Sequence, residues 1–236
     1  MNGSSSTRPC ATPNCRRRAR SDQARFCELC RARRRRHGDA AVRSGIWLKD
    51  LRPYIVRIRR LIRRGNADKV EQALITLHTF LGDYVRDEIA ERGSRSLQGP
   101  PHEMQALRVV GHVLEEAKPL DVGITLAAVW LMRAREPWRF LTDQVFRFDL
   151  VRMFRKLASM SFGSYWSPAM NAIHRTYREL RPATIETIAT ILIDVYARFG
   201  SRIIEADALE RAKRKDARTL IDEGLAPCTQ ANPTVL

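Results

Sequence analysis

The sequence lacks a hydrophobic run that could cross a membrane. Its longest apolar stretch, residues 122–132, is well short of the roughly 20 residues that a transmembrane helix needs. Residues 1–7 are polar and serine-rich, and no apolar segment follows them, so we also expect no secretory signal. These two absences predict a cytoplasmic protein with no membrane partner.

Acidic residues are scarce in the first quarter of the chain. Residues 1–64 contain 19 Arg and Lys against 4 Asp and Glu, whereas residues 65–236 contain 23 against 22. The net charge of +16 therefore lies almost wholly at one end. A cationic excess of this size favours a polyanionic partner, and its position indicates which segment would bind it. A general abundance of arginine is the alternative, but abundance alone would not deplete acidic residues from one segment.

Cysteine is also sparse, and four of the five cysteines lie within 21 positions. Residues 1–45 contain few large apolar side chains, so a segment this short needs a metal or disulfides to hold its shape. In a reducing cytosol, two closely spaced cysteine pairs are typical of a structural zinc site. We predict that Zn²⁺ is bound by the Cys-x4-Cys and Cys-x2-Cys pairs, Cys10, Cys15, Cys27 and Cys30. Four unrelated thiols in a disordered arm are the alternative.

The spacing of each cysteine pair predicts its local structure. The insert between the first two cysteines, residues 11–14, has the composition of a turn, and the two-residue gap of the second pair is typical of a helix that begins at the ligands. We expect this helix to run through Arg36 and end at Gly38. His37 is assigned to the helix end or to a phosphate contact, because four thiolates already complete the metal shell.

The arginines of this segment are the predicted nucleic-acid contacts. A stripe of the helix formed by Arg31, Arg34 and Arg35 is expected to enter a groove, because guanidinium groups can bind guanine edges with two hydrogen bonds. No aromatic residue lies among these arginines to stack on unpaired bases, so duplex DNA is favoured over RNA. Further arginines flank the stripe or fill the linker, where we expect phosphate contacts: Arg33, Arg36, Arg16, Arg17, Arg18 and Arg20.

Residues 10–39 resemble the short zinc-finger module of many phage and mobile-element proteins, which often lies beside HNH endonuclease domains. The resemblance rests on Cys10-x4-Cys15, on Phe26-Cys27-x2-Cys30 followed by the arginine run, and on the closing Gly38-Asp39. Two positions depart from the pattern, because Cys30 stands where His is more usual and Arg35 where an aromatic residue is common. The resemblance implies that this segment contacts DNA in a bacterial or phage-infected cell, and implies little about the remaining residues.

The remainder of the sequence shows the apolar periodicity of helices rather than the alternation of strands. We expect Asp50 and Asn66 to cap the first two helices, a turn over residues 161–168 before a helix that starts at Pro168, a break or kink at Gly200, and no strand after residue 45. The helical patterns cover about 51–64, 66–92, 102–117, 121–135, 138–158, 185–199 and 201–223.

The helix over residues 51–64 carries a second cationic surface. At about 100° per residue, Arg57, Arg60 and Arg64 lie opposite its apolar stripe, so we expect them to extend the nucleic-acid contact. Binding to an anionic membrane is the alternative, but the apolar stripe is narrow and a folded body can cover it.

The predicted fold is mainly α, with a small N-terminal zinc-binding module followed by an all-α helical bundle. By residue, we expect an arginine-rich zinc-finger module (1–45), a basic amphipathic helix and a core helix (46–92), a loop (93–101), a helical body (102–223) and a flexible tail (224–236).

No catalytic constellation is visible in the sequence. The histidines are scattered over predicted helices, so no HNH unit is indicated, and no phosphate-binding loop is present. His112, Glu115 and Glu116 share a helical face, but such a face is more often a solvated polar surface.

The sequence therefore predicts a zinc-dependent, duplex-DNA-binding accessory or regulatory protein of a bacterial or phage mobile element. Its helical body would serve for dimerisation or for docking another protein. Two alternatives remain: a nuclease or recombination factor whose active site is not recognisable, and an RNA-binding adaptor of a ribonucleoprotein assembly. Cutting of a plasmid in Mg²⁺ would indicate the first, and preference for folded RNA over duplex DNA the second.

Overall fold

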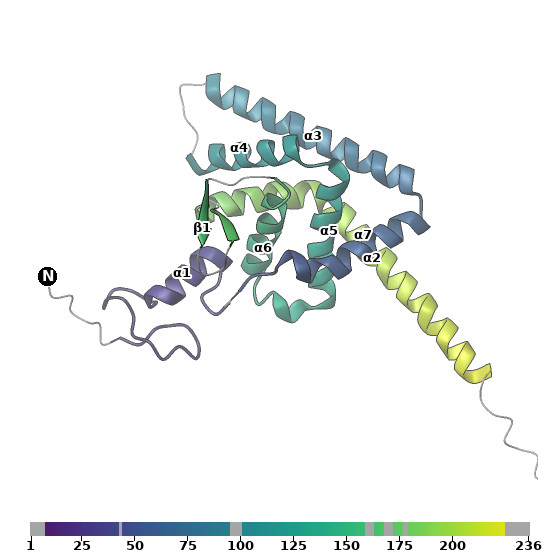
Figure 1. Ribbon diagram of the computed structural model, residues 1–236, viewed down its shortest axis with the longest axis horizontal. Coiled ribbons are helices and arrows are strands. Elements are labelled where there is room, and N and C mark those ends of the chain that lie inside the picture. Colours follow the sequence, from purple (N-terminus) through teal and green to yellow (C-terminus); the bar gives the residue numbers. More distant parts are fainter. Residues whose placement is uncertain are drawn as a thin grey trace, which may run out of the picture.

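A computed structural model describes residues 8–42, 44–94, 101–158, 163–167, 172–176 and 179–224. Over these residues the fold is mainly α, as the sequence predicts, with a small cysteine-rich module followed by a helical body (Figure 1). The interior of the predicted loop, residues 95–100, and the predicted tail beyond Gly224 lie outside the described residues.

The chain forms seven α-helices, one 3-10 helix and one pair of strands within the described residues. In chain order these are α1 (Glu28–His37), α2 (Leu48–Arg64), α3 (Ala67–Ser94), α4 (Pro101–Glu116), α5 (Pro119–Arg135), η1 (Pro137–Arg139), α6 (Asp143–Arg155), β1 (Gly163–Ser167), β2 (Ala172–Thr176) and α7 (Pro182–Gly224).

Helix α5 lies at the centre of the body and contacts α2, α3, α6 and α7. Its residues 122–129 are all buried, which explains why this segment is the longest apolar run of the chain. A helix that is apolar on every side can be accommodated only where neighbours cover every side. Gly123 permits the closest of these contacts, because a Cβ atom there would lie 2.3 Å from a methyl carbon of Leu74.

Helix ends follow the predicted capping chemistry in part. Asn66 caps α3 as expected, since its side-chain oxygen accepts a hydrogen bond from the N–H of Lys69 at 3.1 Å. Asp50 was expected to be the N-cap of α2, and that prediction is wrong. The helix starts earlier, and Asp50 accepts a hydrogen bond from the N–H of Trp47 at 2.8 Å from within the first turn.

The helix expected over 138–158 is shorter than predicted. Its first residues form η1, and α6 begins only after Thr142, whose hydroxyl accepts a hydrogen bond from the N–H of Val145 at 3.3 Å. The apolar periodicity alone predicts one helix over this segment. The Thr142 cap divides the segment, because it starts a new helix within it.

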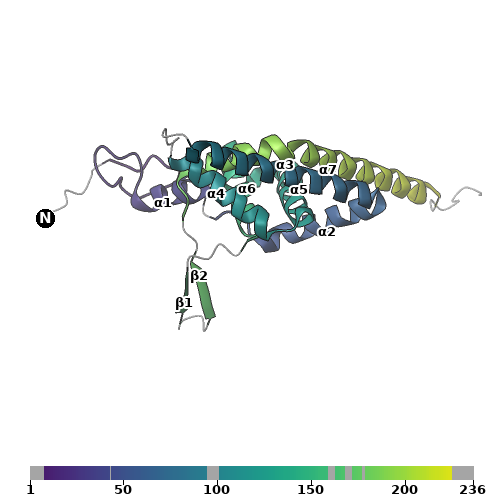
Figure 2. The same ribbon diagram turned by 90° about the horizontal axis from the view of Figure 1, so that it is seen from above.

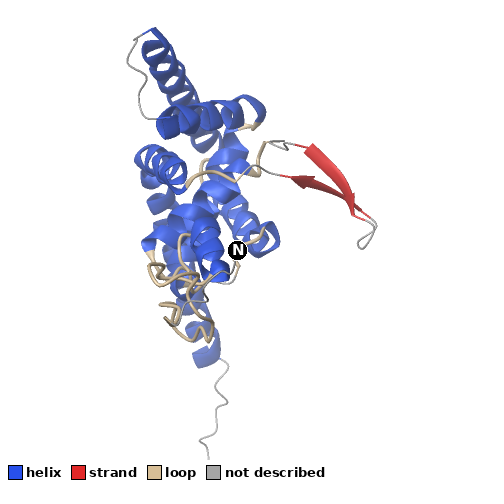
Figure 3. Ribbon diagram, turned by 90° about the vertical axis from the view of Figure 1, so that its left-hand side faces the viewer, coloured by secondary structure: helices blue, strands red, loops and turns tan. Residues whose placement is uncertain are grey.

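A β-hairpin contradicts the expectation that no strand follows residue 45. Strands β1 and β2 pair antiparallel, with Gly163 opposite Thr176 and Ser167 opposite Ala172. The hairpin projects from the helical body (Figures 2 and 3). The helix predicted to start at Pro168 is therefore wrong, because β2 occupies part of that segment; Pro168 itself lies outside the described residues. Strands of five residues are too short for their alternation to stand out from a turn-rich sequence.

Helix α7 runs through Gly200 without interruption, so the break predicted there is wrong. The glycine instead allows the close approach of α5, because a Cβ atom at position 200 would lie 2.9 Å from the ring of Trp130. The C-terminal part of α7 extends past the body toward the lower right of Figure 1.

Candidate metal centre and basic module

The four cysteines of the predicted ligand set come together in the structure. One sulfur from each of Cys10, Cys15, Cys27 and Cys30 lies within 4.8 Å of the others. Cys15 Sγ lies 3.9 Å from Cys27 Sγ and 3.6 Å from Cys30 Sγ. Four thiolates bound tetrahedrally to one ion with bonds of about 2.3 Å would place their sulfurs about 3.8 Å apart. The cluster is therefore able to hold a metal ion.

A small antiparallel bridge and a turn position the first cysteine pair. Pro9 pairs with Arg18, and the N–H of Cys10 donates a hydrogen bond to the carbonyl of Arg17 at 3.0 Å. Between the two ligands the N–H of Cys15 donates to the carbonyl of Thr12 at 3.1 Å, which closes the predicted turn. Asn14 has a φ of 60° in this turn, a left-handed conformation that asparagine tolerates better than most residues.

The second cysteine pair begins helix α1. Cys27 is the N-cap of this helix, and the N–H of Cys30 donates a hydrogen bond to its sulfur at 3.5 Å. The N–H of Cys27 in turn donates to Cys10 Sγ at 3.3 Å, so the two pairs are joined through the backbone. The helix ends at Gly38, whose φ of 79° completes the predicted C-cap.

The thiols of the cluster differ in their tendency to ionise. Burial opposes ionisation of Cys10, but hydrogen bonds from the backbone of Cys27 and from Thr12 outweigh it and lower the pKa of Cys10 to about 6. Burial and the neighbouring thiols raise the pKa of Cys30 to about 12. One thiolate therefore forms readily, whereas four adjacent thiolates would repel one another. A bound divalent cation would remove that repulsion.

The module has almost no apolar core apart from the sulfurs. Its buried cluster consists of three cysteines and Ala40, with Cys15 and Phe26 packed against them. An apolar cluster of this size does not stabilise a fold of some 35 residues, and a metal ion held by the cysteines would supply folding energy.

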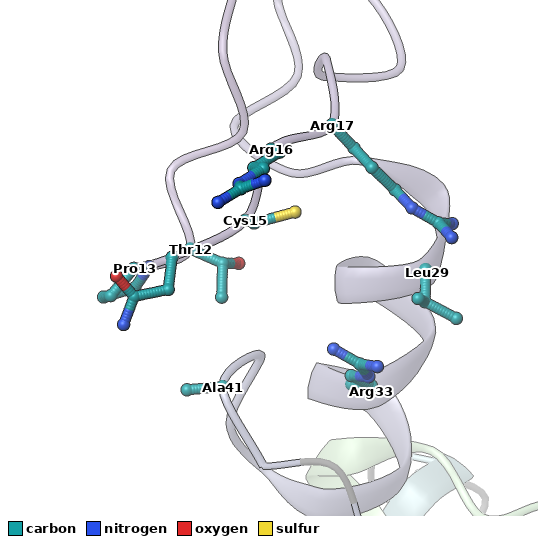
Figure 4. Close-up of a pocket in the computed structure, with 9 residues that line it drawn as sticks. Thr12, Pro13, Cys15, Arg16, Arg17, Leu29, Arg33 and Ala41 are labelled. Carbon is teal, nitrogen blue, oxygen red and sulfur yellow. The ribbon is translucent and has the colours of Figure 1, made fainter.

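Arginines from both halves of the module surround a hollow beside Cys15. The hollow has a volume of about 470 Å³, and Arg16, Arg17 and Arg33 are among the residues that line it (Figure 4). Arg16 and Arg17 come from the linker and Arg33 from α1. The fold therefore brings together residues that the sequence predicts on two separate segments. We call this feature the arginine hollow.

The predicted stripe of α1 is exposed throughout, and its C-terminal end also contacts the body. Arg31 and Arg34 are exposed, and the guanidinium of Arg34 lies 5.4 Å from the ring centroid of Phe26. Arg35 and its neighbour Arg36 are also exposed, and they donate hydrogen bonds to the carboxylate of Glu179 at 3.3 and 2.7 Å. The linker residues Arg18 and Arg20 are exposed.

Arg152 of α6 fixes the module to the body. Its guanidinium donates hydrogen bonds to the carbonyl of Arg36 at 2.7 Å, to Nδ1 of His37 at 2.8 Å and to the buried carboxylate of Asp149 at 2.7 Å. Burial and the cationic Arg152, Arg36 and Arg33 lower the pKa of His37 to about 4, so its ring is neutral at physiological pH. Asp149 and Arg152 were not singled out from the sequence, although a carboxylate flanked by Phe148 and Leu150, with an arginine three residues later, could have indicated a buried ionic contact.

The cationic residues predicted on α2 lie away from the module. The side chain of Arg57 is only 13% exposed and forms ion pairs with Asp207 and Glu210 of α7 at 2.8 Å. Arg64 also pairs with Glu210, while Arg60 is exposed. The face that was expected to extend the module's contact therefore packs in part against a helix that the sequence did not associate with it.

No second metal cluster is found among the described residues. On the polar face of α4, Nε2 of His112 lies 3.2 Å from a carboxylate oxygen of Glu116, and both side chains are partly exposed, consistent with a solvated surface. Of the other histidines, His78 donates a hydrogen bond from Nε2 to the carbonyl oxygen of Leu114 in α4 at 2.9 Å, and the side chain of His174 lies outside the described residues.

No protein family, curated protein or solved structure that was compared with the chain matches it significantly. Among the described helices, none combines the length and the apolar character that a bilayer crossing requires.

Proposed function

We propose that the chain binds duplex DNA through a zinc-stabilised N-terminal module, as an accessory or regulatory protein of a bacterial or phage mobile element. The observation that supports the proposal most directly is the placement of the four sulfurs and the arginine hollow within one small unit. Cys10, Cys15, Cys27 and Cys30 would hold Zn²⁺, which supplies the folding energy of the module and takes no part in chemistry on the nucleic acid.

The arginine hollow gives the proposal a specific anion contact. Arg16 and Arg17 follow one cysteine pair and Arg33 follows the other, so the three residues line the same hollow only while the pairs are held together. Guanidinium groups around the hollow would suit phosphates of the DNA backbone, because a guanidinium can bind a phosphate with two hydrogen bonds. Nucleic-acid affinity would therefore depend on the metal through geometry.

The exposed arginines of α1 and the linker would complete the contact. Arg31 and Arg34 present guanidinium groups to solvent, and Arg18 and Arg20 extend the cationic surface from the linker. Arg35 and Arg36 are engaged with Glu179 and have a smaller role in this proposal.

Duplex DNA is favoured over single-stranded RNA because the module offers no stacking platform. Phe26 is the sole aromatic residue among residues 8–42, and the guanidinium groups of Arg25 and Arg34 lie over its ring at 5.9 and 5.4 Å. Proteins that bind unpaired bases generally present free aromatic faces to them. The helical body would provide the surface for a second copy or another protein.

The test removes the arginine hollow while leaving the cysteines intact. Replacing Arg16 and Arg33 with Ala should weaken binding to a 20-base-pair duplex on the order of 10- to 100-fold at 100 mM salt, because two phosphate contacts are lost. The matched control replaces two exposed arginines of the body, Arg86 and Arg108, and should leave affinity nearly unchanged. Chelation of the metal should reproduce the loss. Equal affinities of the two variants, or tighter binding to folded RNA than to the duplex, would refute the proposal.

A further inference from the structure

A second basic surface lies where α2 meets the distal part of α7, at the opposite end of the molecule from the module (Figure 1). Two carboxylates of α7 organise it. Asp207 pairs with Arg57, Arg135 and Arg211, and Glu210 pairs with Arg57, Arg64 and Arg214. We call this surface the distal ridge and define it by its cationic side chains, Arg57, Arg60, Arg64, Arg135, Arg211, Arg214, Lys215 and Arg218.

The distal ridge carries more positive charge than its carboxylates neutralise. Asp207 and Glu210 together serve five guanidinium groups, which leaves three positive charges in excess. Three of these arginines keep about half of their side-chain surface in solvent: Arg64 (59%), Arg211 (55%) and Arg214 (51%). Each guanidinium has five N–H donors, so donors remain after the carboxylates are satisfied. The ion pairs therefore hold the arginines in place and leave N–H donors that can bind an anion.

Further cations extend the distal ridge beyond this network. Arg60 precedes Arg64 by one helical turn, and Arg218 follows Arg214 by one turn, with Lys215 beside it. All three are exposed and form no ion pair among the residues that the structure describes. On α7 the cations recur at steps of three and four residues, which places them on one side of the helix. This part of α7 extends past the body as a straight helix (Figure 1). A row of this kind suits a linear polyanion better than a single small anion.

We propose that the distal ridge is a second binding surface for the phosphate backbone of duplex DNA, so that one chain contacts the duplex at two separated places. This inference rests on the proposed function for its choice of polyanion. It joins the α2 arginines that the sequence singled out to four cations of α7 that it did not, Arg211, Arg214, Lys215 and Arg218.

The distance between the two surfaces follows from the length of α7. Arg36 of the module contacts Glu179, just before the helix starts at Pro182, and the distal ridge begins at Asp207. At about 1.5 Å per residue these 25 residues span roughly 38 Å. Since a duplex rises about 3.4 Å per base pair, this corresponds to roughly 11 base pairs. The distal ridge continues to Arg218, 36 residues beyond Pro182, which corresponds to roughly 54 Å or about 16 base pairs. A 12-base-pair duplex, about 41 Å long, is therefore too short to cover the module and the whole ridge, whereas a 40-base-pair duplex can reach both.

The test uses the full-length, metal-loaded protein and duplexes of 12 and 40 base pairs. The ridge variant replaces Arg60, Lys215 and Arg218 with Ala, and the control variant removes equal charge elsewhere, at Arg86, Arg108 and Arg198. A third variant removes the module arginines Arg16, Arg31 and Arg33. Relative to the control, the ridge variant should bind the 40-base-pair duplex at least about tenfold more weakly, and its logarithmic salt dependence should become shallower by about 2 to 3. Its affinity for the 12-base-pair duplex should change about twofold or less.

The variants separate failure of this inference from failure of the proposed function. If the ridge variant matches the control on both duplexes while the module variant loses binding, the distal ridge is not a DNA surface and the proposed function stands. If the module variant matches the control while the ridge variant loses binding to both duplexes, the ridge binds DNA and the proposed role of the module is wrong. If the ridge variant loses binding to both duplexes equally, the two-place contact is refuted.

Discussion

The buried carboxylate of Asp207 accepts a hydrogen bond from Nε of Arg57 at 2.8 Å, and this contact joins α7 to α2. Arg135 of α5 donates to the same carboxylate at 2.6 Å. Burial opposes ionisation of Asp207, but Arg135 and Arg57 outweigh it and hold its pKa below the usual value. Three helices that are far apart in the sequence therefore meet at one negative charge.

We expect Asp207→Asn to lower the free energy of unfolding by about 3–5 kcal/mol, because it leaves partly buried guanidinium groups without their counter-charge. Urea denaturation followed by circular dichroism measures the change. Asp194→Asn, at an exposed position of the same helix, is the control and should change stability by less than about 0.5 kcal/mol. Equal midpoints for the two variants would show that the ion pairs at Asp207 contribute little.

Cys27→Ser should abolish metal retention and DNA binding while the helical body keeps its circular dichroism. Serine is a good N-cap, so the substitution preserves the cap of α1 and removes only the thiolate. Metal analysis and duplex titration measure the two effects. Cys228→Ser, at the fifth cysteine, which lies outside the described residues, is the control and should retain the metal. An unchanged metal content in the Cys27 variant would remove this residue from the site.

Two glycine substitutions should act in opposite directions. At Gly123 an added Cβ would lie 2.3 Å from Leu74, so Gly123→Ala should destabilise the protein by about 1–3 kcal/mol through overpacking. At Gly82 of α3 an added Cβ would meet nothing within 4 Å, so Gly82→Ala should stabilise it by about 0.5–1 kcal/mol through helix propensity. Thermal unfolding of the two variants tests both. A stabilised Gly123 variant would show that α3 and α5 pack less closely than described.

His37 should make stability depend on pH. Its pKa is lowered to about 4 in the folded protein, so the unfolded chain takes up the proton first as the pH falls. The neutral ring therefore contributes stability that is fully present above pH 6.5 and is lost as the pH falls toward 4. Asp149 acts in the opposite direction, because burial raises its pKa to about 6 and its protonation in the folded state adds stability as the pH falls from about 6 toward 3.8.

His37→Asn isolates the histidine, because asparagine keeps an acceptor for Arg152 but does not titrate. Between pH 7.5 and 5.0 the variant should lose less free energy of unfolding than the wild type, and the effect of Asp149 cancels in the comparison. Parallel pH profiles for the two proteins would contradict the contribution assigned to His37.

Features fixed by short-range chemistry could be predicted from the sequence. Such features include the local structure of each cysteine pair, the end of α1 at Gly38 and the cap of α3 at Asn66. Each of them depends on residues within a few positions of one another. The mainly α fold also follows from local periodicity.

Features that depend on contacts between distant residues could not be predicted. Gly200 appears in the sequence as a helix break, yet it is required by the ring of Trp130, 70 positions earlier. Likewise, the arginines of α2 appear solvated until Asp207 and Glu210 of α7 are placed beside them, and no pattern in either helix indicates which partner it meets.

Helix α1 connects the cysteine cluster to the point where the module packs on the body. The length of α1 therefore sets the rotation of the cluster relative to the body. Cys27 lies at one end, and at the other Gly38 packs so closely on Gln144 that an added Cβ would come within 3.0 Å of it. Each residue of a helix turns it by about 100°, so inserting one residue would swing the cysteine cluster to another side of the body. Four inserted residues would nearly restore the original orientation and move the cluster outward by about 6 Å. Changes in this segment that preserve whole turns should be tolerated far better than single insertions or deletions.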